Sequence, residues 1–117
     1  MTKNKEAARK IFEMQCQICK AMAHPVRLEI VELLHGREMS AADLLEALET
    51  SKANLSKNMA MLVQAGIVDA TRDGRQVSYR LSDPEIHEAC VIMRSLLYKR
   101  LKQGEKLASA IGSSRSR

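Results

Sequence analysis

Two helix-start signals close together constrain the fold of this chain more than any other feature. Ser40 is followed three positions later by Asp43, which is the pattern of a capping box. After a break at residues 49–50, Ser51 precedes a second amphipathic stretch that continues to Gln64. A short helix, a tight break and a second amphipathic helix together predict a helix-turn-helix.

Helical periodicity continues on both sides of this motif. Residues 5–23 and 84–103 carry apolar side chains at helical spacing along one face, and residues 25–35 are apolar around most of their circumference. Pro25 and Pro84 stand at the expected first turns of the second and last helices, where proline is tolerated. We therefore expect five helices, with the second one central.

Between the fourth and last helices the periodicity changes to that of strands. Residues 67–72 and 76–81 are short strand candidates, and Asp73-Gly74 between them is a strong hairpin signal. Only 3% of the residues are aromatic while 45% are hydrophobic, so aliphatic side chains and methionine must fill the core, which favours helices. The predicted fold is mainly α with a small β-hairpin wing, a winged helix-turn-helix.

The length of the chain limits the number of domains, and its charge indicates the kind of partner. The 117 residues fit one domain, and we expect a DNA-binding and dimerisation domain over residues 1–103 and a basic, disordered tail over 104–117. A net charge of +5 favours a polyanionic partner. No apolar run approaches the roughly 18 residues that span a bilayer, and the polar N-terminus lacks a signal-peptide core, so a cytoplasmic location is predicted.

The exposed side of the helix that begins after Ser51 is predicted to contact DNA. It carries Ser51, Lys52, Asn54, Ser56, Lys57 and Asn58. Lysine can meet guanine or phosphate, asparagine can pair with adenine, and serine suits either, while residues 51–64 contain no acid. Arg72 and Arg75 of the hairpin are placed to reach the minor groove or the backbone. The alternatives are an ordinary solvated helix face, a protein-interaction module or a nonspecific architectural DNA-binding protein.

Three stretches of the chain resemble the ArsR/SmtB family of bacterial winged-helix transcriptional repressors. They are residues 19–30, with the run Ala-His-Pro-Val-Arg-Leu, residues 51–66, and residues 67–81 with the wing. The likeness covers about residues 5–101 in family order. It implies a homodimer joined through the first and last helices and release from DNA when an inducer binds. The apolar faces of those two helices independently favour a dimer, because the small core leaves them uncovered.

The metal sites of similar proteins are only partly matched. One family site uses a Cys-x-Cys at the start of the third helix, where this chain has Ser40 and Ala42. Another uses ligands at both ends of the last helix. There only Asp83 matches, and Leu96 and Lys99 occupy the later positions. We therefore do not expect a zinc site of that kind.

The hypothesis that the protein senses an effector is based on its three cysteines, Cys16, Cys19 and Cys90. Cys16 and Cys19 share one helical face, and packing of the first and last helices in a dimer can bring all three thiols together, within or between subunits. Three thiolates suit a thiophilic ion such as arsenite or cadmium, whereas two can form a disulfide or polysulfide link that reports oxidants or reactive sulfur. Free cysteines also pack as small hydrophobes, which leaves a winged-helix regulator without cysteine sensing as the alternative.

An enzyme is the remaining class to weigh. Cys16 and Cys19 have the C-x-x-C spacing of thiol oxidoreductases, but that chemistry needs the pair at a helix N-terminus beside a sheet. Here the pair lies deep inside a helix. A second C-x-x-C, a Ser/His/Asp pattern and a glycine-rich phosphate loop are all missing from the sequence. We predict a protein that is not an enzyme.

Overall fold

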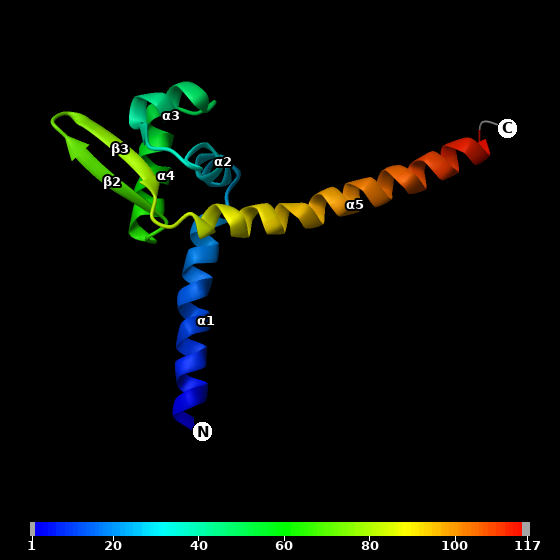
Figure 1. The fold of residues 1–117 in the computed structure, drawn as a ribbon, viewed down its shortest axis with the longest axis horizontal. Coiled ribbons are helices and arrows are strands. Elements are labelled where there is room, and N and C mark those ends of the chain that lie inside the picture. The colour runs from blue at the N-terminus through cyan, green and yellow to red at the C-terminus, as the bar shows by residue number, and fades with distance from the viewer. Residues whose placement is uncertain (1, 116–117) are drawn as a thin grey trace. The chain divides into compact units, whose positions relative to one another are not determined.

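Over residues 2–115, five helices and a small antiparallel sheet follow one another in the predicted order, with one additional short strand (Figure 1). This computed structural model describes those residues and the side chains of residues 3–112. The chain divides into two units, Met1–Ile86 and His87–Arg117. The first unit holds four helices and the sheet, and the second consists of the greater part of the last helix.

The first unit contains four helices, of which the third and fourth begin at side-chain caps and the second begins at Pro25. They are α1 (Thr2–Met22), α2 (Pro25–Leu33), α3 (Ala41–Ala47) and α4 (Lys52–Gln64). The backbone N–H of Asp43 donates to Ser40 Oγ at 3.0 Å, and the N–H of Ser40 donates to Asp43 Oδ2 at 3.4 Å, so the predicted capping box is confirmed. Ser51 Oγ accepts the N–H of Asn54 at 3.1 Å and caps α4.

The sheet contains a strand that periodicity did not predict. Strands β2 (Val68–Asp73) and β3 (Gln76–Leu81) form the hairpin, and β1 (Met39–Ser40) pairs with the other edge of β3, giving the order β1-β3-β2 with antiparallel pairing throughout. Two residues are too few to show an alternating pattern, so the sequence did not predict β1.

The hairpin turn lies one residue later than the sequence indicated. Asp73 pairs with Gln76, so the two-residue loop is Gly74-Arg75 rather than Asp73-Gly74. Gly74 has φ +63°, and Arg75 has no positive φ. A positive φ at the first loop position alone, filled by glycine, is typical of a type II′ turn, whose twist matches that of the flanking strands.

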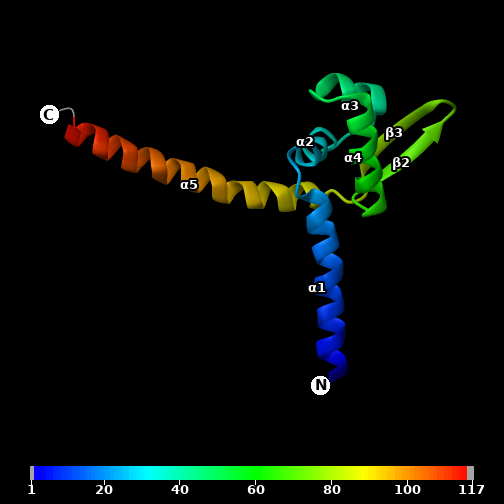
Figure 2. The same ribbon diagram turned by 180° about the vertical axis from the view of Figure 1, so that it is seen from behind.

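The core of the first unit lies between α2, α3, α4 and the start of β2, which stand together in both ribbon views (Figures 1 and 2). Its largest fully buried side chains are Ile30, Val31, Leu34, Leu44, Met59, Leu62, Ile67 and Val68. Val63, about 100° around α4 from the fully buried Leu62, is 38% exposed.

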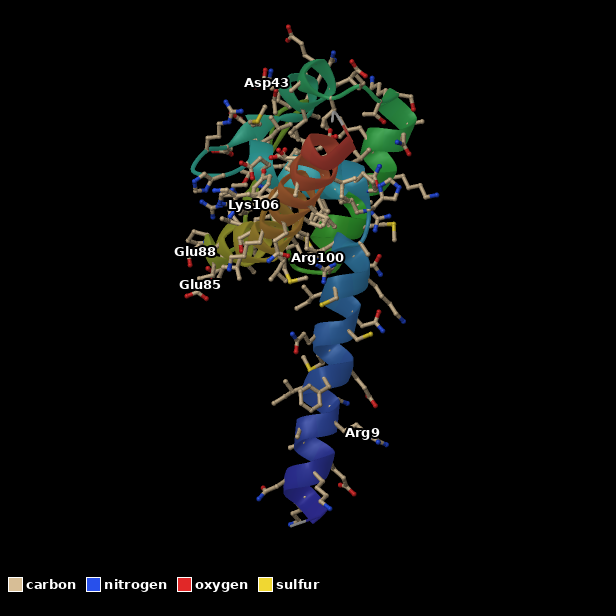
Figure 3. The ribbon with its side chains drawn as sticks, turned by 90° about the vertical axis from the view of Figure 1, so that its right-hand side faces the viewer. Arg9, Asp43, Glu85, Glu88, Arg100 and Lys106 are labelled. Carbon is tan, nitrogen blue, oxygen red and sulfur yellow. The ribbon has the colours of Figure 1, made fainter. Side chains whose placement is uncertain are left out.

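Most of α1 lies outside this core. Residues 3–20 are all exposed, whereas Ala21 in the last turn is buried and its carbonyl accepts a bond from Arg27 of α2. Figure 3 shows side chains projecting from α1 on either side of Arg9. We call four exposed side chains the α1 apolar arc: Ile11, Phe12, Met14 and Ile18.

The last helix, α5 (Glu85–Arg115), begins as expected but is longer than predicted. Asp83 Oδ1 accepts the N–H of Glu85 at 2.8 Å and caps the helix, and Figure 3 shows Glu85 and Glu88 side by side on its first turn. The end predicted near Gln103 is wrong, because the helix passes through Gly104. One glycine costs a helix only about 1 kcal/mol relative to alanine.

The predicted disordered tail is therefore helical over residues 104–115, and residues 116–117 lie outside the described residues. The domain boundary at residue 103 stays a prediction. α5 carries its own exposed apolar side chains, among them Ile92, Leu97 and Leu101. Within the described residues, none of the helices is long and apolar enough to cross a membrane.

Candidate nucleic-acid interface

Helix α4 presents five of its six predicted contact residues to solvent. They are Ser51, Lys52, Asn54, Ser56 and Lys57. Two of the polar groups already have partners in the free protein, since Ser51 Oγ caps the helix and Asn54 Nδ2 donates to Thr50 Oγ1 at 2.7 Å. The two lysines and Ser56 complete an exposed face without a carboxylate.

Asn58 does not belong to this exposed face, which corrects the prediction for that residue. Its side chain is only 3% exposed. Its Oδ1 accepts from Arg27 Nε at 2.9 Å, and its Nδ2 donates to the carbonyl of Asn54, also at 2.9 Å. A base contact by Asn58 is therefore not available in this conformation. Its spacing from Leu55 and Leu62 puts it on the buried stripe of α4, and that signal was present in the sequence.

The wing carries its predicted arginines on the surface. Arg72 and Arg75 are both exposed, with Arg75 in the turn itself. Arg80, farther from the tip, stands opposite Asp69 on the neighbouring strand, with its Nε 4.0 Å from Asp69 Oδ2. An exposed pair at that distance contributes little stability but keeps Arg80 close to a carboxylate. Arg72 and Arg75 are thus the better placed of the three for a phosphate.

A surface hollow joins the α4 face to the wing. It has a volume of about 410 Å³ and lies between the start of α3, the side of α4 that carries Lys52 and Ser56, and strand β3. Lys52 and Ser56 of α4 and Arg75 of the turn line it, and none of its lining residues is acidic. Residues predicted from two separate sequence segments therefore meet around one depression, whose lining includes two cationic side chains and no acid, as contact with an anionic backbone requires.

The three cysteines lie on the two helices outside the core. Cys16 and Cys19 of α1 are both exposed, and Cys90 of α5 is partly exposed. Among residues 2–115, no group of three or more His, Cys, Asp or Glu side chains lies close enough together to hold a metal ion. The exposure of the α1 pair satisfies one requirement for thiol chemistry.

Comparisons with known proteins agree with this geometry. A model of a helix-turn-helix domain matches residues 22–70. The HTH-type transcriptional regulator Rv0081 of Mycobacterium tuberculosis is 37% identical over 90 residues, covering 74% of this chain and 77% of the relative. Its crystal structure matches with a TM-score of 0.71 at 33% identity, covering 80% of this chain and 94% of that one. The HTH-type transcriptional repressor SmtB of the same organism is 35% identical over 75 residues, covering 64% of this chain and 56% of SmtB.

This chain belongs to the ArsR/SmtB family. Another relative is the transcriptional activator HlyU of Vibrio cholerae, which is 34% identical over 79 residues, covering 68% of this chain and 73% of HlyU. The structure contains the helix-turn-helix and the hairpin wing, and it matches that of a relative, so the predicted winged helix-turn-helix is confirmed. The matched helix-turn-helix range contains α2, α3 and α4 and so includes the exposed lysine-bearing face described above.

Proposed function

We propose that this chain is a homodimeric, sequence-specific DNA-binding repressor that acts in the cytoplasm and leaves its operator when an effector reacts with its cysteines. The observation that carries the DNA-binding part is the acid-free face of α4, which continues around one hollow to Arg75 of the wing. Relatives are named both as repressor and as activator, and for this chain we propose repression.

In this proposal α4 is the reading helix and occupies the major groove. Lys52 and Lys57 are cations for guanine acceptors or phosphates, and Ser56 is a short donor beside them. Asn54 exchanges its bond to Thr50 for a base contact when DNA binds. Arg72 and Arg75 hold the wing against the backbone or the adjacent minor groove.

A second copy of the chain is the proposed cover for the exposed apolar side chains of the first and last helices. The α1 apolar arc includes Phe12 at 67% exposure, and α5 exposes Ile92 at 68%. Burying such side chains between two identical chains removes apolar surface from water and creates a two-fold axis. A two-fold dimer presents two reading helices to half-sites about 34–36 Å apart.

The effector part of the proposal rests on the exposed pair Cys16 and Cys19. Cβ atoms three residues apart on a helix are about 5–6 Å from each other, whereas a disulfide needs about 3.8 Å. A disulfide between the pair therefore requires α1 to deform. A thiophilic ion such as arsenite or cadmium can bridge the pair and take a further thiolate, and Cys90 of either subunit is the candidate. Disulfide formation and ion binding would therefore both change the part of α1 that carries Cys16 and Cys19.

Fluorescence anisotropy tests the DNA-binding proposal directly. Reduced protein is titrated onto a labelled duplex from the region upstream of its own gene, with unrelated duplex as competitor. We expect a preference for the upstream duplex of at least about a thousandfold, the lower end for specific binding proteins. Equal affinity for both duplexes would instead support the nonspecific architectural protein.

Lys57→Ala is expected to weaken operator binding about tenfold without unfolding the protein, because one cationic contact is lost. Lys3→Ala is the matched control, since it removes the same charge from an exposed position in the first turns of α1. The salt dependence of binding identifies the contact: a lost phosphate contact lowers the slope of log K against log salt by about 1. Unchanged affinity would remove Lys57 from the interface.

Replacing both Cys16 and Cys19 with serine is expected to leave operator affinity intact and to abolish release by the effector. The reagents are arsenite, cadmium, hydrogen peroxide and a polysulfide, each added separately to the bound complex. Cys90→Ser is tested in parallel. If it changes only the thermal midpoint, Cys90 is a packing residue. Release that persists in the double variant would contradict sensing by the α1 pair.

A further inference from the structure

A single buried guanidinium connects three helices of the first unit. Arg27 of α2 is only 9% exposed. Its Nη1 donates to the carbonyl of Ala21, in the last turn of α1, at 3.1 Å. Its Nε donates to Asn58 Oδ1 at 2.9 Å and its Nη2 to Met61 Sδ at 2.9 Å, and both acceptors belong to α4. One side chain thus bridges the end of α1 and the middle of the reading helix.

The hydrogen bonds continue from Asn58 to the start of the reading helix. Asn58 Nδ2 donates to the carbonyl of Asn54 at 2.9 Å. The side chain of Asn54 in turn donates to Thr50 Oγ1 at 2.7 Å, and its backbone N–H donates to the capping Ser51 Oγ at 3.1 Å. An unbroken series of bonds therefore runs from the last turn of α1 to residues predicted to face DNA.

The chemistry of arginine makes this connection stiff. The guanidinium is planar, so the directions of its N–H groups are fixed with respect to one another. All three acceptors of Arg27 are uncharged, and a buried cation that loses an acceptor remains poorly solvated. A displacement of the last turn of α1 must therefore either break a costly bond or move α4 with it.

We propose that Arg27 is a positioning residue that transmits the state of α1 to the reading helix, so that modification of the α1 thiols changes operator affinity through the Arg27–Asn58 bond. This inference rests on the proposed function. Cys19 lies two residues before Ala21, within the helix end that Arg27 holds. Chains of hydrogen bonds can carry energetic coupling between sites, and the bonds above form such a chain.

N-ethylmaleimide is the probe, because it alkylates exposed thiols without needing a metal or an oxidant. It is used on protein carrying Cys90→Ser, in which Cys16 and Cys19 are the remaining thiols. Operator affinity is measured by anisotropy before and after alkylation, at a protein concentration where sedimentation shows a dimer in both states. We expect alkylation to weaken binding about tenfold, within the usual range of coupling between sites.

Adding Arg27→Lys should reduce that effect to less than about twofold, because an ammonium cannot hold three diverging acceptors at once. Arg37→Lys is the matched control. Arg37 is exposed and its Nε donates only within its own segment, to the carbonyl of Leu33 at 2.7 Å, so the response of about tenfold should persist. Asn58→Ala breaks the same connection at its α4 end, should also lose the response, and decides the question if Arg27→Lys does not fold.

A purely structural Arg27 gives a different result. Arg27→Lys then lowers the thermal midpoint while alkylation still weakens binding about tenfold, and this outcome overturns the proposal. Side-chain amide NMR signals provide a readout that needs no DNA: alkylation should shift the signals of Asn54 and Asn58 in the Cys90→Ser protein but not after Arg27→Lys. Unshifted signals would overturn the coupling, whereas failure to bind the operator with shifted signals would contradict the proposed function instead.

Discussion

Ile18→Glu is expected to convert the dimer to a monomer and to lower operator affinity by at least about a hundredfold. Ile18 belongs to the α1 apolar arc and is 46% exposed in the single chain. Across a two-fold axis the substitution places two carboxylates in an apolar interface, where a charge without a partner is costly. Loss of the dimer removes the gain of about 10²–10⁴ that linked binding to two half-sites provides.

Gln17→Glu is the matched control for this experiment. Gln17 precedes Ile18 on the polar side of α1 and is also exposed, so the substitution adds the same charge to the same helix. Sedimentation velocity reports the oligomeric state, and anisotropy reports the affinity. A Gln17→Glu protein should remain a dimer with nearly unchanged affinity. A dimer that persists after Ile18→Glu would show that the α1 apolar arc lies outside the subunit interface.

Leu62→Ala is expected to lower the free energy of unfolding by about 2–5 kcal/mol, because it leaves a cavity under the reading helix. Leu62 is completely buried, and its carbonyl accepts the N–H of Ile67 at 3.0 Å where α4 leads into the wing. A small domain has about 5–15 kcal/mol of stability in total, so this loss is a large fraction of it.

Val63→Ala is the control for the core substitution. The neighbouring side chain is 38% exposed, so its truncation should cost less than about 1 kcal/mol. Both proteins are unfolded in urea at the same chain concentration, since the stability of a dimer depends on concentration. A similar loss in the two variants would mean that Val63 is covered in the assembled protein.

The features that the sequence predicted well are determined by residues close together along the chain. The Ser40–Asp43 capping box and the Ser51 cap involve groups three residues apart, and the structure contains both. The hairpin was found because glycine provides its positive φ, although the loop lies one residue later. The long final helix was cut short because Gly104 weakens a helix without ending it.

The sequence predicted the candidate site correctly only for residues whose side chains are exposed to solvent. The lysines of α4 lie on the surface as expected. Asn58 was wrongly predicted to face DNA: its spacing from Leu55 and Leu62 indicated the buried stripe, but its partner Arg27, 31 residues earlier, was not evident from the sequence. A polar side chain on the boundary of an apolar stripe is assigned to solvent unless its distant partner is known. Arg27 was missed for the same reason, since the run of apolar residues around it gives no indication of what its guanidinium contacts.

Ser40 has two structural duties, and this has a practical consequence for building chimeric regulators. Its backbone pairs with Ser78 in the sheet while its hydroxyl caps α3, so the wing and the helix-turn-helix share one residue as a joint. The strands of a wing taken from a relative have their own preferred twist, which need not match the pairing at Ser40. Successful grafts should therefore exchange residues 39–43 together with residues 68–81, so that strand and cap remain matched.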